Sequence, residues 1–268
     1  MEHPRAFLPS KVVLKTIDTS RKKDMNLLGE EPLSIRLDGK PYVVVMRTPG
    51  DDLAHAAGFC LSEGIIEKRS HYSSIASCDG EEKNVITVTL TSERRKAVSA
   101  LLERSAFVSQ TSCGICGKEL IDDFCEAVFS VKNGVTISFQ AAYRLIDELG
   151  NHQVLRDATR ASHAAAVFDS ELNVISVSED VGRHNAVDKA LGRLLMDNRL
   201  DEARILVLSS RVSYELVNKA ARAKISVILS VSRPTSLAVQ LGAKLNIAMA
   251  SLAKPEGIYI YNGEDRFI

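Results

Sequence analysis

Residues 205–231 decide the fold class of this chain, and they read I-L-V-L-S-S-R-V-S-Y-E-L-V-N-K-A-A-R-A-K-I-S-V-I-L-S-V. Both ends of the stretch are short, continuous apolar runs, and residues 214–223 between them have apolar side chains at helical spacing. Continuous apolar strands are typical of sheets that are buried on both faces, and a strand–helix–strand order joins parallel strands. The stretch therefore predicts a βαβ unit within a parallel sheet.

The segments on either side extend this pattern. Apolar spacing predicts further helices from about residue 186 and at 236–245, and two short strands follow the second of these helices. Residues 164–168 and 174–178 flank a turn and predict a hairpin. The fold class of this part is therefore α/β, a βαβ-type sheet covered by helices, and we assign it to residues 136–268.

The first part of the chain mixes short strands and helices without this alternation. Strands are predicted at 33–37, 42–47, 73–77 and 85–90, and helices after Asp52 and at 93–103. Asp38 and Gly39 form the predicted turn between the first two strands. The prediction is a smaller α+β N-terminal domain over residues 1–105, joined to the α/β domain by a loop and helix at 106–135.

Composition limits the classes of function. Lys+Arg and Asp+Glu both total 34, so overall charge gives no reason to expect nucleic acid or an anionic membrane as a partner. No apolar run approaches the roughly 18 residues that a membrane helix needs, and the N-terminus lacks the apolar core of a signal peptide. The five cysteines are too few, and odd in number, for a disulfide framework. We therefore expect the protein in the reducing cytoplasm.

Three polar loops follow the predicted strands, at residues 179–185, 209–213 and 232–236. In parallel sheets the ligand site lies beyond the carboxyl ends of the strands, so these loops should open at one edge. Each loop carries an arginine, namely Arg183, Arg211 and Arg233. Helix N-termini and arginines both attract anions, which predicts a phosphate-bearing or otherwise anionic ligand. The alternative is that the polar residues of these loops only cap the helices that follow.

Two histidines lie close to these loops in the sequence or in the predicted sheet. His184 stands between Arg183 and Asn185, shortly after Glu179 and Asp180, and this cluster of charge favours a functional role. His163 begins a predicted strand, and we interpret it as a structural histidine.

A pair of thiols lies in S-C-G-I-C-G-K, residues 112–118, just before a predicted helix. A helix N-terminus and Lys118 would both favour the thiolate form of Cys113 and Cys116. The pair is compatible with a zinc site completed by distant histidines, with a thioredoxin-like dithiol, and with a carrier that holds a persulfide. No second Cys-x-x-Cys is present to complete a tetrahedral zinc site, and Cys125 is interpreted as a packed apolar residue.

Several blocks of the chain resemble one family. The blocks are S-C-G-I-C-G-K, E-D-V-G-R-H-N-A-V-D-K, S-x-R-x-S-Y-E-L-V-x-K-A and P-T-S-L-A-V, together with M-R-T-P-G-D-D-L-A near the N-terminus. Over residues 30–261 the chain is similar to the FdhD family of formate dehydrogenase accessory proteins. The resemblance implies a sulfurtransferase that accepts persulfide sulfur from a cysteine desulfurase. It would deliver that sulfur to the molybdenum bis(molybdopterin guanine dinucleotide) cofactor of formate dehydrogenase.

The resemblance also implies a homodimer and a second domain similar in fold to cytidine deaminase. Deaminase chemistry itself is excluded, because neither H-x-E nor P-C-x-x-C is present to hold and assist a zinc-bound hydroxide. Two other functions stay open: a chaperone that binds the cofactor without moving sulfur, and a thiol–disulfide oxidoreductase.

The resemblance assigns the site residues by position. Cys113 and Cys116 match the sulfur-bearing pair, with Cys113 favoured as the persulfide carrier. The positions implied to contact the cofactor, for which GDP is a possible analogue, are Glu179, Asp180, Gly182, Arg183, His184, Asn185, Arg211, Ser213, Thr235, Leu252, Ala253, Lys254, Pro255, Glu256 and Gly257.

Overall fold

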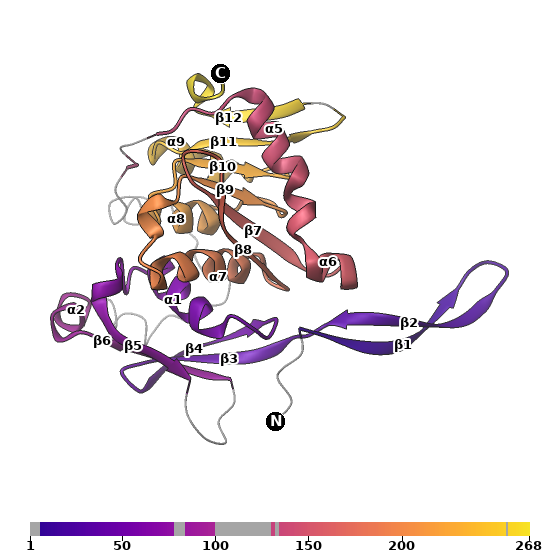
Figure 1. Ribbon diagram of the computed structural model, residues 1–268, viewed down its shortest axis with the longest axis horizontal. Helices are drawn as coiled ribbons and strands as arrows, with labels where there is room; N and C mark the ends of the chain where they lie inside the picture. The colour runs from indigo at the N-terminus through magenta and orange to yellow at the C-terminus, as the bar shows by residue number, and fades with distance from the viewer. Residues whose placement is uncertain (1–5, 78–83, 100–129, 132–133, 256) are drawn as a thin grey trace.

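The computed structural model describes residues 6–77, 84–99, 130–131, 134–255 and 257–268. Three sheets organise this part of the chain: a two-stranded ribbon, a four-stranded sheet and a six-stranded sheet (Figure 1). The predicted domain limits near residues 105 and 135 stay predictions, because residues 100–129 lie outside the described part.

The six-stranded sheet has the order β12-β11-β10-β9-β7-β8. Its strands are β7 (His163–Phe168), β8 (Val174–Asp180), β9 (Ile205–Leu208), β10 (Val227–Ser230), β11 (Ala248–Ala253) and β12 (Gly257–Asn262). The predicted parallel arrangement is confirmed for β9, β10 and β11, and the predicted hairpin is confirmed for β7 and β8, which pair antiparallel. Strand β7 is also antiparallel to β9, and β12 is antiparallel to β11. Short connections require the antiparallel pairing of β7 with β8 and of β11 with β12, because only antiparallel neighbours can be joined by a few residues. The sheet is therefore mixed, and its likeness to cytidine deaminase stays a prediction.

Alternate side chains of the central strands enter two separate cores. On one face Leu206, Ile228 and Met249 pack with α7 (Arg183–Met196), α8 (Tyr214–Arg222) and α9 (Ser236–Lys244). On the other face Val207 and Leu229 pack against α5 (Phe139–Asp147). Burial on both faces is the reason these strands are continuously apolar.

Helices α5 and α6 (Val154–Thr159) were not predicted. Ser138 begins α5 as an ordinary N-cap, since its side chain accepts a hydrogen bond from the backbone N–H of Ala141. The predicted helix near residue 186 begins earlier than expected, at Arg183. Short 3₁₀ turns lie at Arg69–His71, Glu148–His152, Leu200–Glu202 and Glu264–Arg266.

The N-terminal part contains the predicted strands and the predicted helix after Asp52, whereas residues 100–103 of the helix predicted at 93–103 lie outside the described part. Its sheet has the order β4-β3-β6-β5, formed by β3 (Glu31–Leu37), β4 (Lys40–Arg47), β5 (Tyr72–Ser77) and β6 (Val85–Leu90). Asp38 and Gly39, both at positive φ, make the predicted turn. Helix α1 (Asp52–Ser62) packs against this sheet, and α2 (Ser92–Ala97) follows β6.

The ribbon consists of β1 (Phe7–Lys15) and β2 (Ser20–Leu28) and was not predicted. It extends away from the rest of the molecule in Figure 1, so most of its side chains have no core to enter. The strand prediction relied on buried apolar residues, and this segment has too few of them.

Helices α1 and α7 bring the two parts of the chain into close contact. A Cβ atom on Gly58 of α1 would overlap the backbone oxygen of Asp188, and one on Gly192 of α7 would overlap the backbone oxygen of Ala54. Both helices therefore depend on glycine where they cross. Because of this close approach, a single apolar core runs from Leu33 in β3 to Leu191 in α7.

Candidate functional site

The predicted loops do meet at one edge of the six-stranded sheet. Strand β8 is antiparallel to β7, and β7 is antiparallel to β9, so β8 runs in the same direction as β9, β10 and β11. The segments after these four strands, at residues 181–185, 209–213, 231–236 and 254–255, therefore leave the same edge. We call this set of segments the loop edge.

His184 and Ser213 join two of these segments. The Nε2 atom of His184 lies 3.4 Å from the Oγ atom of Ser213 and 3.9 Å from a carboxylate oxygen of Glu215. Burial, followed by the positive charges of Lys219 and Arg183, lowers the pKa of His184 from 6.5 to about 4. The ring is therefore neutral at physiological pH, where one of its nitrogen atoms can accept a hydrogen bond.

The three arginines of the loop edge lie in different environments. The Nε atom of Arg183 is buried and has no hydrogen-bond partner among the described residues, whereas Arg211 and Arg233 are exposed. The guanidinium of Arg233 lies 4.9 Å from the ring centre of Tyr259 in β12. A buried donor without a partner costs free energy, so Arg183 is the arginine with the strongest requirement for a further acceptor.

Other predicted site residues have structural partners. Thr235 accepts a hydrogen bond from the N–H of Ala238 and so caps α9, as the capping interpretation expected. Ser213 precedes α8 without such a bond, which leaves its hydroxyl to His184. The carboxylate of Glu179 in β8 accepts hydrogen bonds from the N–H groups of Leu155 and Arg156 and from the hydroxyl of Ser162. The first two of these bonds fasten α6 to the end of β8, next to the loop edge.

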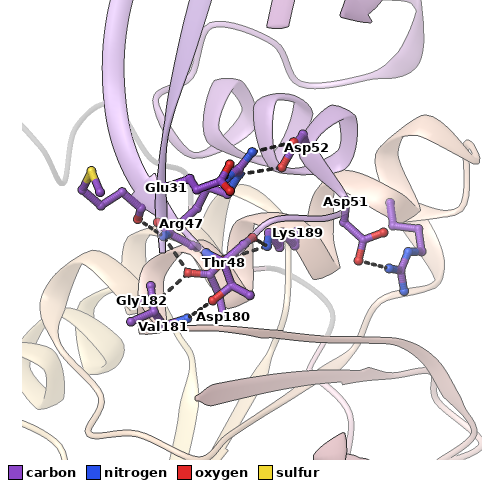
Figure 2. Close-up of polar contacts among 12 residues, drawn as sticks. Glu31, Arg47, Thr48, Asp51, Asp52, Asp180, Val181, Gly182 and Lys189 are labelled. Carbon is purple, nitrogen blue, oxygen red and sulfur yellow. Dashed lines mark hydrogen bonds and ion pairs between the residues drawn. The ribbon is translucent and has the colours of Figure 1, made fainter. Parts of the chain in front are cut away.

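Asp180 is completely buried and connects the loop edge to the N-terminal part (Figure 2). Its carboxylate forms a 2.7 Å ion pair with Lys189 and accepts hydrogen bonds from the N–H of Thr48, the N–H of Gly182 and the amide of Asn185. These bonds occupy the acceptor positions that a ligand would otherwise use. Asp180 therefore positions the loop through contacts within the protein.

Thr48 supplies three of the contacts that hold this loop. Its N–H donates to Asp180, its hydroxyl accepts from the N–H of Val181, and its carbonyl accepts from the ammonium group of Lys189 (Figure 2). Asn185 adds a bond to the carbonyl of Met46. The shape of the loop at residues 180–185 thus depends on the end of strand β4.

Further buried charges surround this junction. Arg47 is fully buried and forms a two-bond contact with Asp52, and it also bonds Asn84. Deeper between the helices, Lys219 donates to Asp188 at 2.7 and 2.8 Å. These pairings were not predicted from the sequence. The signal was the unusual charge of two short segments, R-T-P-G-D-D and E-D-V-G-R-H-N-A-V-D-K, although the charge alone does not identify the partners.

The C-terminal segment of the predicted site lies at the same edge. Leu252 and Ala253 end β11, Lys254 and Pro255 are exposed, and Gly257 begins β12 opposite Ala253. Glu256 lies outside the described residues. The hydroxyl of Tyr143 in α5 donates to the carbonyl of Pro255 and ties this segment to the other face of the sheet.

Cys113 and Cys116 also lie outside the described residues, so their distance from the loop edge stays untested. Cys60 is the one cysteine that the structure does describe, and burial raises the pKa of its thiol. A buried thiol of raised pKa is a poor nucleophile, which leaves sulfur chemistry to other cysteines. In the described ranges, His, Cys, Asp and Glu side chains form no group of three or more that could hold a metal ion.

The lowered pKa of His184 predicts a dependence of stability on pH. Between pH 6.5 and about 4 the unfolded chain binds a proton at this ring that the folded protein excludes, so stability is lost as the pH falls. Replacing His184 with glutamine should reduce the loss of unfolding free energy between pH 7 and pH 5 by about 1–2 kcal/mol, after allowance for partial exposure. Urea unfolding of both proteins at the two pH values measures this difference. Equal losses in the two proteins would show that His184 titrates normally.

The fold and the loop edge together define a class: a mixed α/β protein with polar, arginine-bearing loops at one sheet edge. The chain matches the model of the FdhD/NarQ family over residues 28–268. It therefore belongs to the FdhD/NarQ family.

Relatives of known name support this membership. The chain is 38% identical over 249 residues to the sulfur carrier protein FdhD of Streptomyces coelicolor, covering 90% of this chain and 88% of the relative. It is 34% identical over 250 residues to the protein of the same name from Picrophilus torridus, covering 91% and 92% of the two chains. These relatives match nearly their whole length.

The fold has a counterpart among solved structures. A crystal structure of a proposed formate dehydrogenase accessory protein from Desulfotalea psychrophila is similar with a TM-score of 0.78. The match covers 98% of this chain and 100% of the other, at 23% sequence identity, so it supports the fold. In the part of this chain that the structure describes, no helix has the length and apolar character needed to cross a membrane.

Proposed function

We propose that this protein is a sulfur carrier, a sulfurtransferase that moves persulfide sulfur from a cysteine desulfurase to the molybdenum bis(molybdopterin guanine dinucleotide) cofactor of formate dehydrogenase. The observation that carries the proposal is the similarity over nearly the whole chain to proteins named sulfur carrier protein FdhD. The presence of two closely spaced cysteines, Cys113 and Cys116, adds the chemical means. We further propose that the protein works in the cytoplasm as a homodimer.

The proposed chemistry has two balanced steps. The thiolate of Cys113 attacks the outer sulfur of the donor's persulfide, a new S–S bond forms, and the donor leaves as a thiolate. The thiol of Cys116 then attacks the sulfur atom of Cys113 that is bonded to the chain. This releases the outer sulfur as sulfide to the cofactor and leaves a Cys113–Cys116 disulfide. A cellular thiol reductant then reduces the Cys113–Cys116 disulfide to the two thiols. The two electrons that it supplies balance the reduction of the persulfide sulfur to sulfide.

The loop edge is the proposed binding surface for the guanine dinucleotide. The phosphates of the dinucleotide would accept hydrogen bonds from Arg183 and Arg211. The Nε atom of Arg183, which has no partner among the described residues, fits an acceptor of this kind. Neutral His184 beside Ser213 would orient the ligand as a hydrogen-bond acceptor. Asp180 and Asn185, which bond within the protein, would position the loop without touching the ligand.

GDP binding tests the pocket. Replacing Arg183 or Arg211 with alanine is expected to weaken GDP binding by about tenfold, because each arginine offers charge-assisted hydrogen bonds to phosphate. Isothermal titration calorimetry measures the affinity. The matched control is Arg199→Ala, because Arg199 follows the C-terminal end of α7, away from the loop edge, and pairs with Glu202. Undiminished binding after both Arg183→Ala and Arg211→Ala would remove these residues from the site.

The function itself is tested in cells that lack their own accessory factor of this family. Expression of this chain is expected to restore formate dehydrogenase activity, because the acceptor cofactor would again receive sulfur. Lack of activity, with the protein folded and the dehydrogenase present, would contradict the proposal.

A further inference from the structure

The β1–β2 ribbon has a chemical character that sulfur transfer does not explain. Successive side chains of a strand point to opposite faces, so the cross-strand register divides the ribbon into two sets. One set, which we call the apolar ribbon face, consists of Leu8, Ser10, Val12, Leu14, Arg21, Lys23, Met25 and Leu27. Beyond its first residues the opposite face has mainly polar side chains, such as Lys11 opposite Asp24 and Lys15 opposite Ser20, with Val13 as an exposed apolar residue.

Four of the five apolar side chains of this face are open to solvent, and Val12 is half-buried. Leu8 is 52% exposed, Leu14 37%, Met25 42% and Leu27 48%. A two-stranded ribbon is only marginally stable in water by itself, and a contiguous exposed apolar patch usually marks an interaction site. The ribbon therefore has the properties of a surface that is covered in a complex.

Charge indicates what covers it. The outer part of the ribbon carries five basic side chains and two acidic ones on a chain whose formal net charge is zero; these are Lys11, Lys15, Arg21, Lys22 and Lys23 against Asp18 and Asp24. Among the described residues, none of the five basic groups forms an ion pair. A cluster of exposed basic side chains without ion-pair partners attracts an acidic protein surface and accelerates association with it.

The base of the ribbon is linked to the loop edge. Helix α6 contacts β2, and the N-terminal N–H groups of α6 at Leu155 and Arg156 donate to Glu179 at the end of β8. Figure 1 shows α6 between the ribbon and the six-stranded sheet. A protein that binds the ribbon would consequently have its own surface next to the loop edge.

We propose that the apolar ribbon face docks the protein that receives the sulfurated cofactor. The partner is an apoenzyme with an acidic, apolar-floored groove beside the opening of its cofactor site. Leucine and methionine side chains of the ribbon enter the groove, and Arg21 and Lys23 pair with its acidic rim. The identity of the acceptor rests on the proposed function, whereas the docking surface rests on the ribbon itself.

Two neighbouring cross-strand pairs provide a matched test. Leu14 lies opposite Arg21 on the apolar ribbon face, and Val13 lies opposite Lys22 on the other face. The double variants Leu14→Ser/Arg21→Gln and Val13→Ser/Lys22→Gln therefore make the same chemical change on opposite faces. Biolayer interferometry with purified apo formate dehydrogenase, made in cells lacking their accessory factor, measures the binding.

The expected result is a loss of affinity of about tenfold or more for Leu14→Ser/Arg21→Gln and less than about threefold for Val13→Ser/Lys22→Gln. Thermal unfolding and sulfur uptake from a desulfurase should be unchanged in both variants. Should the first variant fail to fold, the single change Met25→Ser on the same face replaces it, with the same expectation of selective loss.

Several results would overturn the docking surface. Equal affinities of the two variants would exclude a face-specific contact. If sedimentation shows that Leu14→Ser/Arg21→Gln breaks a self-association and leaves apoenzyme binding intact, the occupant is a second copy of this chain. If only binding to anionic phosphatidylserine vesicles is lost, the occupant is a membrane surface. Failure of the unaltered protein to take up sulfur would contradict the proposed function alone, because the binding comparison does not require sulfur.

Discussion

Replacing Gly192 with alanine is expected to destabilise the protein by roughly 3 kcal/mol or more, enough to lower its melting temperature by several degrees. The added Cβ would overlap the backbone oxygen of Ala54, and a backbone atom cannot move aside as a flexible side chain can. Helices α1 and α7 would have to separate. Because these helices join the two parts of the chain through one apolar core, their separation should lower the stability of both parts.

The matched control for this change is Gly150→Ala. A Cβ on Gly150 meets no heavy atom within 4 Å, and its backbone does not require positive φ, so the change should alter stability by less than about 0.5 kcal/mol. Urea unfolding of the three proteins gives the comparison. Similar stabilities of the Gly192→Ala and Gly150→Ala variants would show that the α1–α7 crossing tolerates a wider separation.

The double change Cys113→Ser and Cys116→Ser is expected to abolish sulfur transfer, because serine hydroxyls form no persulfide. Cells that depend on this chain should then lose formate dehydrogenase activity completely, as measured by formate oxidation in extracts. The single variants divide the roles: Cys113→Ser should lose sulfur uptake, and Cys116→Ser should load sulfur and fail to release it.

Cys60→Ala is the control for this experiment. Cys60 is completely buried in α1 and its thiol has a raised pKa, so its removal should leave sulfur transfer intact. Full dehydrogenase activity with the double serine variant would instead favour a chaperone that binds the cofactor without moving sulfur.

The central fold could be predicted because burial on both faces of the sheet leaves a continuous apolar run in each strand. Residues 205–208 and 227–230 are entirely buried, as their sequence suggested. The ribbon at residues 7–28 escaped prediction for the opposite reason. Its side chains are largely exposed and enter no core, so they lack the regular spacing from which strands were inferred.

The candidate site could be predicted only in part. The arginine-bearing loops could be placed at one edge because the direction of each strand follows from the order of strands and helices along the sequence. Which polar residues serve the fold could not be predicted: Asp180 bonds Thr48, 132 residues away in sequence, and no periodicity reveals such a pairing. The side chains of Asn185 and Glu179 were likewise expected to contact a ligand, but they form hydrogen bonds within the protein.

The most direct test of sulfur transfer is the intact mass of the purified protein after incubation with a cysteine desulfurase and free cysteine. Sulfur transfer through Cys113 predicts that the Cys116→Ser protein, which cannot release its sulfur by forming the Cys113–Cys116 disulfide, gains one sulfur atom per chain. A thiol reductant should remove this sulfur, Cys113→Ser should abolish the gain, and Cys60→Ala should leave it unchanged. A Cys116→Ser protein that gains no sulfur would contradict sulfur transfer and would favour a thiol–disulfide oxidoreductase.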